Sequence, residues 1–223
     1  MHPDWAGATV DLAAARARLI DDLRQDIKDQ RVLKAMSRVP RERFLPAGQE
    51  GLAYQNKPLS IGLGQTISQP LMVGIMTEAL ELGGDEKVLE VGTGSGYQAA
   101  VLAELARWVV SVERLPELAE KARAVLESLG YGNIELHLAE RRLGWPRGAP
   151  YDAIVVTAGA PEVPQDPMGQ LRQGGRMVVP VGSRYEQTLV RVTKSQKRVS
   201  MEDLGPCRWV PLIGEGGWRD PEP

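Results

Sequence analysis

Short apolar segments alternate with helix-like segments through the middle of the chain, and this alternation limits the fold more than any other feature. Helical patterns are expected at residues 97–106, 118–129 and 164–171, where apolar residues recur every three or four positions or alanine and leucine dominate. Strands joined through helices form right-handed crossovers, so we predict a mostly parallel, doubly wound α/β sheet covered on both faces. The five expected strands are residues 87–91, 108–112, 134–138, 153–156 and 176–181.

The segments on either side of this alternating core have other patterns. An amphipathic helix is expected from Leu12 to about Met36, and another from about Leu71 to Leu82, closed by two glycines. Residues 37–70 between them are rich in glycine and proline, and an irregular segment of that length is typically functional. Residues 187–192 and 208–212 are expected to form two further strands without a helix between them, which predicts an antiparallel C-terminal edge.

Composition excludes several classes of protein. The 223 residues carry a formal net charge of −2, so no strong basic field favours nucleic acid. The single cysteine, Cys207, excludes an intramolecular disulfide, and no cluster of metal-ligand residues is evident, so we expect no metal. The chain shows no signal peptide and no apolar run of about twenty residues, so we expect a soluble cytoplasmic protein without membrane contact.

A glycine-rich turn follows the first predicted strand. Gly92, Gly94 and Gly96 stand at alternate positions, Glu90 precedes them, and Glu113 ends the next strand. Alternate glycines let a backbone turn tightly and approach a ligand closely. An acidic residue at the end of the second strand is typical of a group that binds a ribose.

Two classes of cofactor compete for this turn. A dinucleotide turn normally reads G-x-G-x-x-G and places a helix N-terminus under a pyrophosphate. Here the spacing is G-x-G-x-G, and the Glu90 carboxylate is unfavourable for a pyrophosphate. The same carboxylate suits the sulfonium and ammonium of S-adenosylmethionine, which we therefore favour over NAD.

The scarcity of bases limits what could accept a methyl group. The chain has two histidines, His2 near the N-terminus and His137 in a predicted strand, and neither is expected to be catalytic. A carboxylate acceptor, with a pKa of about 4 in solution, is already ionised and needs no general base. Donors that hold it in line with the methyl group are sufficient.

The stretch GLGQTISQP at residues 62–70 could supply such donors. Thr66 and Ser68 carry hydroxyl groups that can donate to a carboxylate or to a cofactor, and the two glycines permit close approach. An ordinary helix start, with Ser68 as N-cap and Pro70 in the first turn, explains the same residues. Spacing alone slightly favours the helix start.

Several segments, taken together, have a pattern found in one family. They are residues 38–46 (RVPRERFLP), Ala53-Tyr54, Pro58-Leu59, residues 64–70 (GQTISQP), 90–97 (EVGTGSGY), 149–154 (APYDAI) and 210–214 (VPLIG). In these segments the chain resembles the protein-L-isoaspartate O-methyltransferase family. The resemblance implies a Rossmann-like class I S-adenosylmethionine-dependent methyltransferase fold. It also implies esterification of the α-carboxylate of isoaspartyl residues in damaged proteins or peptides, followed by spontaneous closure to a succinimide.

The resemblance also assigns roles to residues of this chain. It implies one methyltransferase domain over residues 1–223, with N-terminal helices and the active-site loop in 1–83, the cofactor-binding core in 84–182 and C-terminal strands lining the substrate cleft in 183–223. The sequence does not show the oligomeric state, and we favour a monomer. The implied site residues are Ser68 as the active-site serine, Gln65, Thr66, Ile67 and Ser68 as the loop over donor and acceptor, Glu90, Gly92, Gly94, Gly96 and Glu113 around the donor, and Val210 and Ile213 beside the substrate.

One segment departs from the family pattern. The family's Gly-Asp-Gly, whose aspartate lies near the adenine amino group, is replaced by Ala139-Glu140-Arg141. Glu140 keeps the carboxylate, while Ala139 and Arg141 remove backbone freedom, and Arg141 could pair with Glu140. Two alternatives to isoaspartate repair therefore stay open: methylation of a normal aspartate in a dedicated partner peptide, and a non-catalytic protein that binds an adenosyl ligand.

Overall fold

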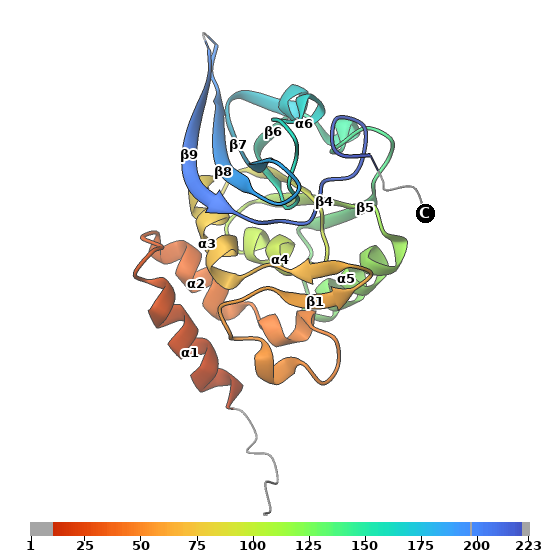
Figure 1. Ribbon diagram of the computed structural model, residues 1–223. Helices are drawn as coiled ribbons and strands as arrows, with labels where there is room; N and C mark the ends of the chain where they lie inside the picture. Colours follow the sequence, from red (N-terminus) through yellow and green to blue (C-terminus); the bar gives the residue numbers. More distant parts are fainter. Residues whose placement is uncertain (1–10, 197, 220–223) are drawn as a thin grey trace, which may run out of the picture.

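A seven-stranded mixed sheet forms the centre of the computed structural model, which describes residues 11–196 and 198–219 (Figure 1). The strand order is β5-β4-β3-β6-β7-β8-β9. The strands are β3 (Lys87–Val91), β4 (Trp108–Glu113), β5 (Ile134–Leu138), β6 (Tyr151–Val156), β7 (Leu171–Gly182), β8 (Gln187–Lys194) and β9 (Val199–Cys207).

Strand direction changes once across this sheet. The pairs β3–β4, β4–β5, β3–β6 and β6–β7 are parallel, whereas β7–β8 and β8–β9 are antiparallel. The predicted parallel core with an antiparallel C-terminal edge is therefore confirmed. The order reverses at β3, which lies between β4 and β6, and ligands of such sheets bind where the order reverses.

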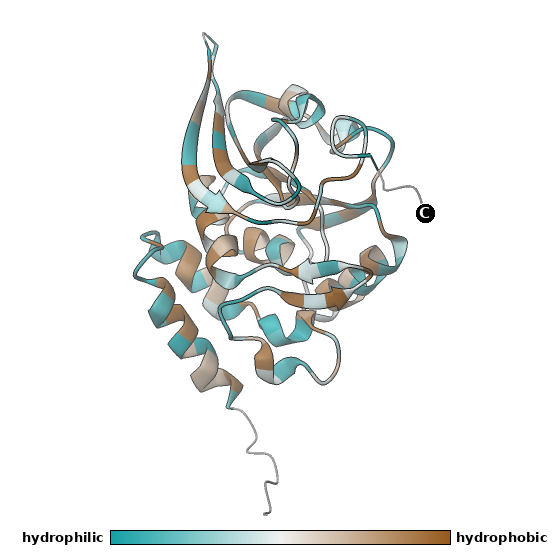
Figure 2. Cartoon of the chain, in the orientation of Figure 1, coloured by the Kyte–Doolittle hydropathy of each residue, from teal (hydrophilic) through white to brown (hydrophobic). Residues whose placement is uncertain are grey.

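Both faces of the parallel strands are buried, which explains why their sequences are continuously apolar. Leu89, Val110 and Ile154 face one hydrophobic cluster, and their chain neighbours Val88 and Val109 face the other. The hydrophobic strands at the centre and the polar outer surfaces of the helices are visible in Figure 2.

Helices cover the sheet as expected of crossover connections. In Figure 1, α4 and α5 lie on one side of the sheet with α1 and α2 beyond them, and α6 lies on the other side. The helices are α1 (Leu12–Leu23), α2 (Gln30–Arg38), α3 (Pro70–Ala79), α4 (Tyr97–Ala103), α5 (Pro116–Ser128) and α6 (Gln165–Gln170).

The prediction of one helix from Leu12 to about Met36 is wrong, because α1 ends at Leu23 and α2 begins at Gln30. Asp29 is the N-cap of α2 and accepts a hydrogen bond from the Arg31 amide. The backbone amides of Lys28 and Asp29 donate to Glu78 Oε1 of α3, at 2.7 and 2.6 Å. The break thus depends on a partner fifty residues away, which local periodicity does not show.

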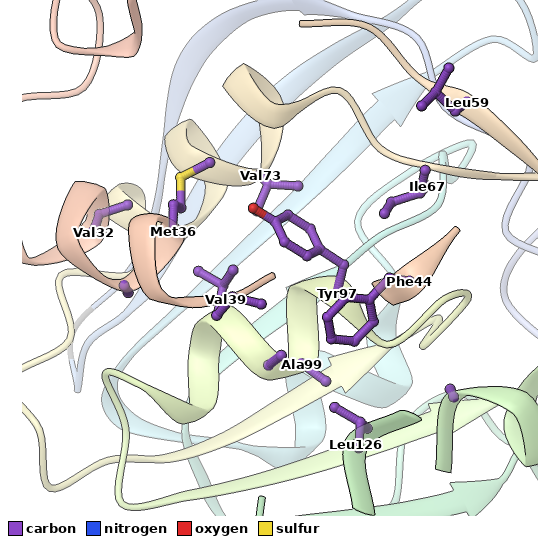
Figure 3. Packing of buried hydrophobic residues seen from close by; sticks show 14 of the residues in the cluster. Val32, Met36, Val39, Phe44, Leu59, Ile67, Val73, Tyr97, Ala99 and Leu126 are labelled. Carbon is purple, nitrogen blue, oxygen red and sulfur yellow. The ribbon is translucent and has the colours of Figure 1, made fainter. Parts of the chain in front are cut away.

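Residues 37–70 are more regular than predicted. They contain two 3-10 turns, η1 (Arg41–Phe44) and η2 (Glu50–Leu52), and an antiparallel hairpin of β1 (Leu59–Gly62) and β2 (Gln65–Ile67). Phe44, Leu59 and Ile67 are buried in the cluster that also holds Tyr97 (Figure 3). The segment is therefore a packed part of the fold.

The predicted strand at residues 208–212 is also wrong. The edge strand β9 ends at Cys207, and the following residues cross the carboxyl end of β6. There the Gly159 amide donates to the Val210 carbonyl and the Leu212 amide donates to the Gly159 carbonyl, both at 2.8 Å. Pro211 has no amide hydrogen for a strand ladder, and the segment makes only an isolated bridge, between Pro211 and Gly159.

Two remaining expectations concern the ends of the chain and membranes. His2 and the ends of the predicted 1–83 and 183–223 segments lie outside the described residues. Within the described part, no helix is both long and apolar enough to cross a membrane.

Candidate active site

A cavity opens where the strand order reverses, and its empty space, open solvent included, is about 860 Å³. Six separate parts of the chain supply most of the cavity lining: residues 65–68, the glycine turn, the end of β4, the loop after β5, the loop after β6, and residues 210–213. The fold thus brings together residues as far apart in the chain as Gln65 and Ile213.

Gly92 and Gly94 line the cavity, and both adopt positive φ angles, of 104° and 54°. A Cβ atom at position 92 would lie 2.4 Å from Oγ1 of Thr157, whose hydroxyl is directed at the Val91 and Gly92 carbonyls. Position 92 therefore requires glycine for both its backbone angle and its neighbour.

Gly96 has a different place from the other two glycines. It is the N-cap of α4 with φ of 89°, and it is not in the cavity wall. A Cβ atom there would lie 3.2 Å from the Ala122 side chain of α5. Gly96 therefore permits α4 to pack close to α5. Its predicted contact with a cofactor stays a prediction, since Gly96 is not among the cavity-lining residues.

Glu113 lies in the cavity wall at the end of β4 and is 6% exposed. One carboxylate oxygen accepts the Gly94 amide at 2.7 Å and the other accepts the Leu115 amide at 2.9 Å. The carboxylate therefore holds the glycine turn in place. Its oxygens can also accept hydrogen bonds from hydroxyl groups in the cavity.

Glu90 lies behind the turn, and it is not one of the cavity-lining residues. It is completely buried; Ser111 Oγ donates to its Oε2 at 2.5 Å and in turn shares a hydrogen bond of 2.5 Å with Thr93. Burial raises the pKa of Glu90 to about 8, against the Ser111 hydrogen bond and helped by the nearby Glu113 charge. The attraction of a cationic ligand by Glu90 stays a prediction; the structure places this carboxyl behind the turn, where its raised pKa favours the neutral form at pH 7. Its Oε1 lacks a hydrogen-bond partner within the described residues.

Residues 65–68 lie across the cavity wall as predicted, with Gln65, Thr66, Ile67 and Ser68 all lining it. The N-cap of α3 is Gln69, with no side-chain capping bond, and Pro70 is the first residue of the helix. The interpretation of Ser68 as an N-cap is therefore wrong. The Ser68 carbonyl is held from behind by Arg41, whose Nη2 donates to it at 2.8 Å.

The C-terminal segment also reaches the cavity, where Val210 and Ile213 are both in its wall. They are there because residues 208–212 leave the sheet and bind across Gly159 instead. The predicted position beside the cleft is observed, although the predicted strand is not.

The segment at residues 139–141 is arranged differently from the expectation. Ala139 lines the cavity, whereas Glu140 and Arg141 are absent from its wall. Glu140 forms an ion pair with Arg147 at 2.7 Å, and Arg141 is exposed. Neither Ala139 nor Arg141 has a positive φ, so this loop does not need the glycines whose loss seemed restrictive.

Several cavity residues were not predicted from sequence. Thr157 could have been predicted, because it is a polar residue directly after the apolar run of β6, and ligands bind at the carboxyl ends of parallel strands. The other unpredicted lining residues have no comparable local signal, and include Thr93, Ser95, Gln98, Arg114, Leu143 and Ala158.

Comparison with known proteins identifies the family. The family model for protein-L-isoaspartate(D-aspartate) O-methyltransferase matches residues 14–217. The chain belongs to this family. A protein named protein-L-isoaspartate O-methyltransferase from Dictyoglomus thermophilum is 50% identical over 206 residues, which are 92% of this chain and 94% of that protein. A protein of the same name from Methanoculleus marisnigri is 54% identical over 193 residues, covering 86% and 88%.

Solved structures agree with the family assignment. One named protein-L-isoaspartate O-methyltransferase aligns with a TM-score of 0.82 and 31% identity, over 91% of this chain and 67% of that one. A Plasmodium falciparum structure, described as a complex with S-adenosyl-L-homocysteine, aligns with a TM-score of 0.74 and 22% identity, and it supports the fold. The Rossmann-like class I methyltransferase fold is thus confirmed.

The ionisable side chains around the site include no metal-binding group and no histidine in the cavity wall, among the described residues. Among the described residues, no group of three or more His, Cys, Asp or Glu could hold a metal ion. His137, outside the cavity wall, stacks on the Trp145 ring with centroids 4.1 Å apart and planes 8° apart. The polar groups of the wall are hydroxyls, amides and the charged residues Glu113 and Arg114.

Proposed function

We propose that this chain transfers the methyl group of S-adenosylmethionine to the α-carboxylate of L-isoaspartyl residues in damaged proteins or peptides. The ester then closes to a succinimide, which opens in part to normal aspartate. The observation that carries the proposal is that one cavity, in a chain of this family, joins the glycine turn and Glu113 to the Thr66 and Ser68 hydroxyls.

The donor side of the cavity fits an adenosyl ligand. Gly92 and Gly94 allow close approach of a ligand to the backbone, and the Glu113 carboxylate can accept the ribose hydroxyls. S-adenosylmethionine supplies an activated methyl group on a sulfonium.

The acceptor side fits a carboxylate. The Thr66 and Ser68 hydroxyls can donate to its oxygens, and it needs no base because it is ionised at neutral pH. Val210 and Ile213 supply apolar wall beside them, which excludes water from the reacting atoms. Alignment of a charged oxygen with the methyl group then provides most of the catalysis.

The test compares an isoaspartyl peptide with its normal aspartyl twin, each incubated with labelled S-adenosylmethionine. We expect label only in the isoaspartyl peptide. Label in both peptides would contradict the proposal. Label in neither would leave methylation of a dedicated partner peptide or a non-catalytic binder, which calorimetry with S-adenosylhomocysteine separates from a chain that has lost the pocket.

We also propose that the whole chain acts as one methyltransferase domain, as a monomer in the cytoplasm, and that it binds neither nucleic acid nor membranes. Within residues 183–223, β8 and β9 form the antiparallel edge of the sheet, and residues 210–213 after β9 line the cavity. Size-exclusion chromatography with light scattering tests the monomer, and a second copy per particle would contradict it.

A further inference from the structure

Arg41 is a charged residue that is completely buried behind the acceptor side of the cavity. Its Nε donates to the Ala53 carbonyl at 2.9 Å and its Nη2 donates to the Ser68 carbonyl at 2.8 Å. Its guanidinium carbon lies 4.8 Å from the centre of the Tyr97 ring, and Tyr97 is itself in the cavity wall. Figure 3 shows Tyr97 between Phe44 and Val73, within this packed region.

The guanidinium has no carboxylate partner within the described residues. Glu42, next in the chain, is bound by Arg16 at 3.0 Å and by the Tyr54 hydroxyl. Burial lowers the pKa of Arg41 to about 10, so the side chain remains charged at neutral pH. Its Nη1 makes no hydrogen bond to the described part of the chain.

Burying a charge without a counter-ion destabilises the folded chain, and filling space in the core does not require a charged side chain. An apolar side chain could fill the same space between η1 and Tyr97. The two carbonyls and the aromatic face compensate part of the cost, and two of these three partners, Ser68 and Tyr97, line the cavity. The arrangement is therefore directed at the site.

We propose that Arg41 is a positioning residue for methyl transfer to a carboxylate, an inference that rests on the proposed function. It fixes the Ser68 carbonyl and so the orientation of the peptide that carries the Ser68 hydroxyl. Its uncompensated positive charge also favours an anionic acceptor over a neutral one beside Ser68. Arg41 itself is absent from the cavity wall and acts through Ser68.

The two roles depend on different properties of the side chain. Orientation depends on the planar fork, which reaches two carbonyls at once, whereas attraction of the acceptor depends on charge. Arg41→Lys keeps the charge and loses the fork, and Arg41→Met keeps most of the volume and loses both. Arg43→Met is the matched control, because Arg43 lies in the same 3-10 turn and its exposed side chain makes one weak hydrogen bond among the described residues, to Ser128 Oγ at 3.3 Å.

Three quantities are measured for each full-length variant, at a temperature where all are folded: kcat and KM for the isoaspartyl peptide, the Kd of S-adenosylhomocysteine, and amide exchange in residues 65–70. For Arg41→Met we expect kcat/KM to fall by about tenfold to about a hundredfold, the range for hydrogen bonds to charged groups. The Kd should stay within about twofold, because the donor side is untouched. Arg41→Lys should recover KM and not kcat, Arg43→Met should match the wild type, and exchange in residues 65–70 should be faster in both Arg41 variants.

Two results would overturn the inference. One is wild-type kcat/KM in Arg41→Met or, if that variant does not fold, wild-type kcat in Arg41→Lys. The other is a parallel loss of activity and donor affinity, which a purely structural residue predicts. If the wild-type chain labels no peptide, the proposed function has failed. The positioning role is then tested by amide exchange alone, and an unchanged rate in residues 65–70 of Arg41→Lys would overturn it.

Discussion

Two ionisable side chains are completely buried behind the cavity, and burial has opposite consequences for their charge. Glu90 lies behind the glycine turn on the donor side, and Arg41 lies behind Ser68 on the acceptor side. Burial raises the pKa of Glu90 to about 8 and lowers that of Arg41 to about 10. At neutral pH the carboxyl is therefore mostly neutral and the guanidinium is charged.

The difference follows from the starting values. A carboxyl group normally titrates well below neutral pH, so a moderate upward shift carries it past pH 7, whereas guanidinium begins so high that a downward shift leaves it charged. The acceptor side of the cavity thus has a positive charge behind it, whereas the carboxylate of the donor side is Glu113, in the wall itself. Four substitutions test this contrast.

The largest expected effect concerns Glu90 and the pH dependence of stability. The pKa of Glu90 is near 8 in the folded chain and near its ordinary value of 4.5 when unfolded. Its stabilising contribution is complete below pH 4.5 and is lost as pH rises through about 8. At about 1.4 kcal/mol per pKa unit, the wild type should lose several kcal/mol over this range.

Glu90→Gln, which cannot ionise, should lack this loss. Urea unfolding of both proteins at pH 5, 6.5 and 8 measures it, with the exposed Glu117→Gln of α5 as the control. Equal pH slopes for wild type and Glu90→Gln would show that Glu90 is ionised in the folded chain, and the contrast with Arg41 would disappear.

The second effect concerns the acceptor side. Ser68→Ala should lower kcat by about tenfold to about a hundredfold, because a hydrogen bond to an ionised acceptor is lost. The affinity for S-adenosylhomocysteine should change little. Steady-state kinetics and calorimetry measure the two quantities, and Ser60→Ala, an exposed serine of β1, is the control. A loss confined to donor affinity would move Ser68 to the donor side of the comparison.

A third effect concerns Glu113, the carboxylate that does line the cavity. Glu113→Gln should weaken S-adenosylhomocysteine by about tenfold, because an amide accepts ribose hydroxyls and the Gly94 amide less strongly than a carboxylate. The fall in kcat at saturating donor should be smaller. Unchanged affinity in calorimetry, with Glu117→Gln again as the control, would remove Glu113 from the ribose site.

The smallest expected effect concerns Arg141. Arg141→Gly restores the residue that the family pattern has, yet Arg141 is exposed, is not in the cavity wall and has no positive φ. We expect a change of less than about twofold in donor affinity, as for other surface substitutions. Arg141→Ala separates loss of charge from gain of backbone freedom. Tighter binding by Arg141→Gly alone would show that the loop is restricted after all.

Much of the fold could be predicted from sequence because it depends on local patterns. The five parallel strands and the crossover helices follow from continuous apolar runs and helical periodicity, with ends displaced by a few residues. The break between α1 and α2 could not be predicted, since Glu78 of α3 stabilises it. The path of residues 208–212 was missed for the same reason, because Gly159 supplies its hydrogen bonds.

The sequence by itself determined the parallel sheet, the glycine turn and the residues of the 65–68 segment, because these are set by side chains close together in the chain. Only the tertiary structure decided which of them meet in one cavity. It also decided the opposite pKa shifts of Glu90 and Arg41, because a pKa depends on burial by residues from distant segments. Glu140 and Arg141 were left outside the cavity wall for a similar reason, as the Glu140 carboxylate pairs with Arg147.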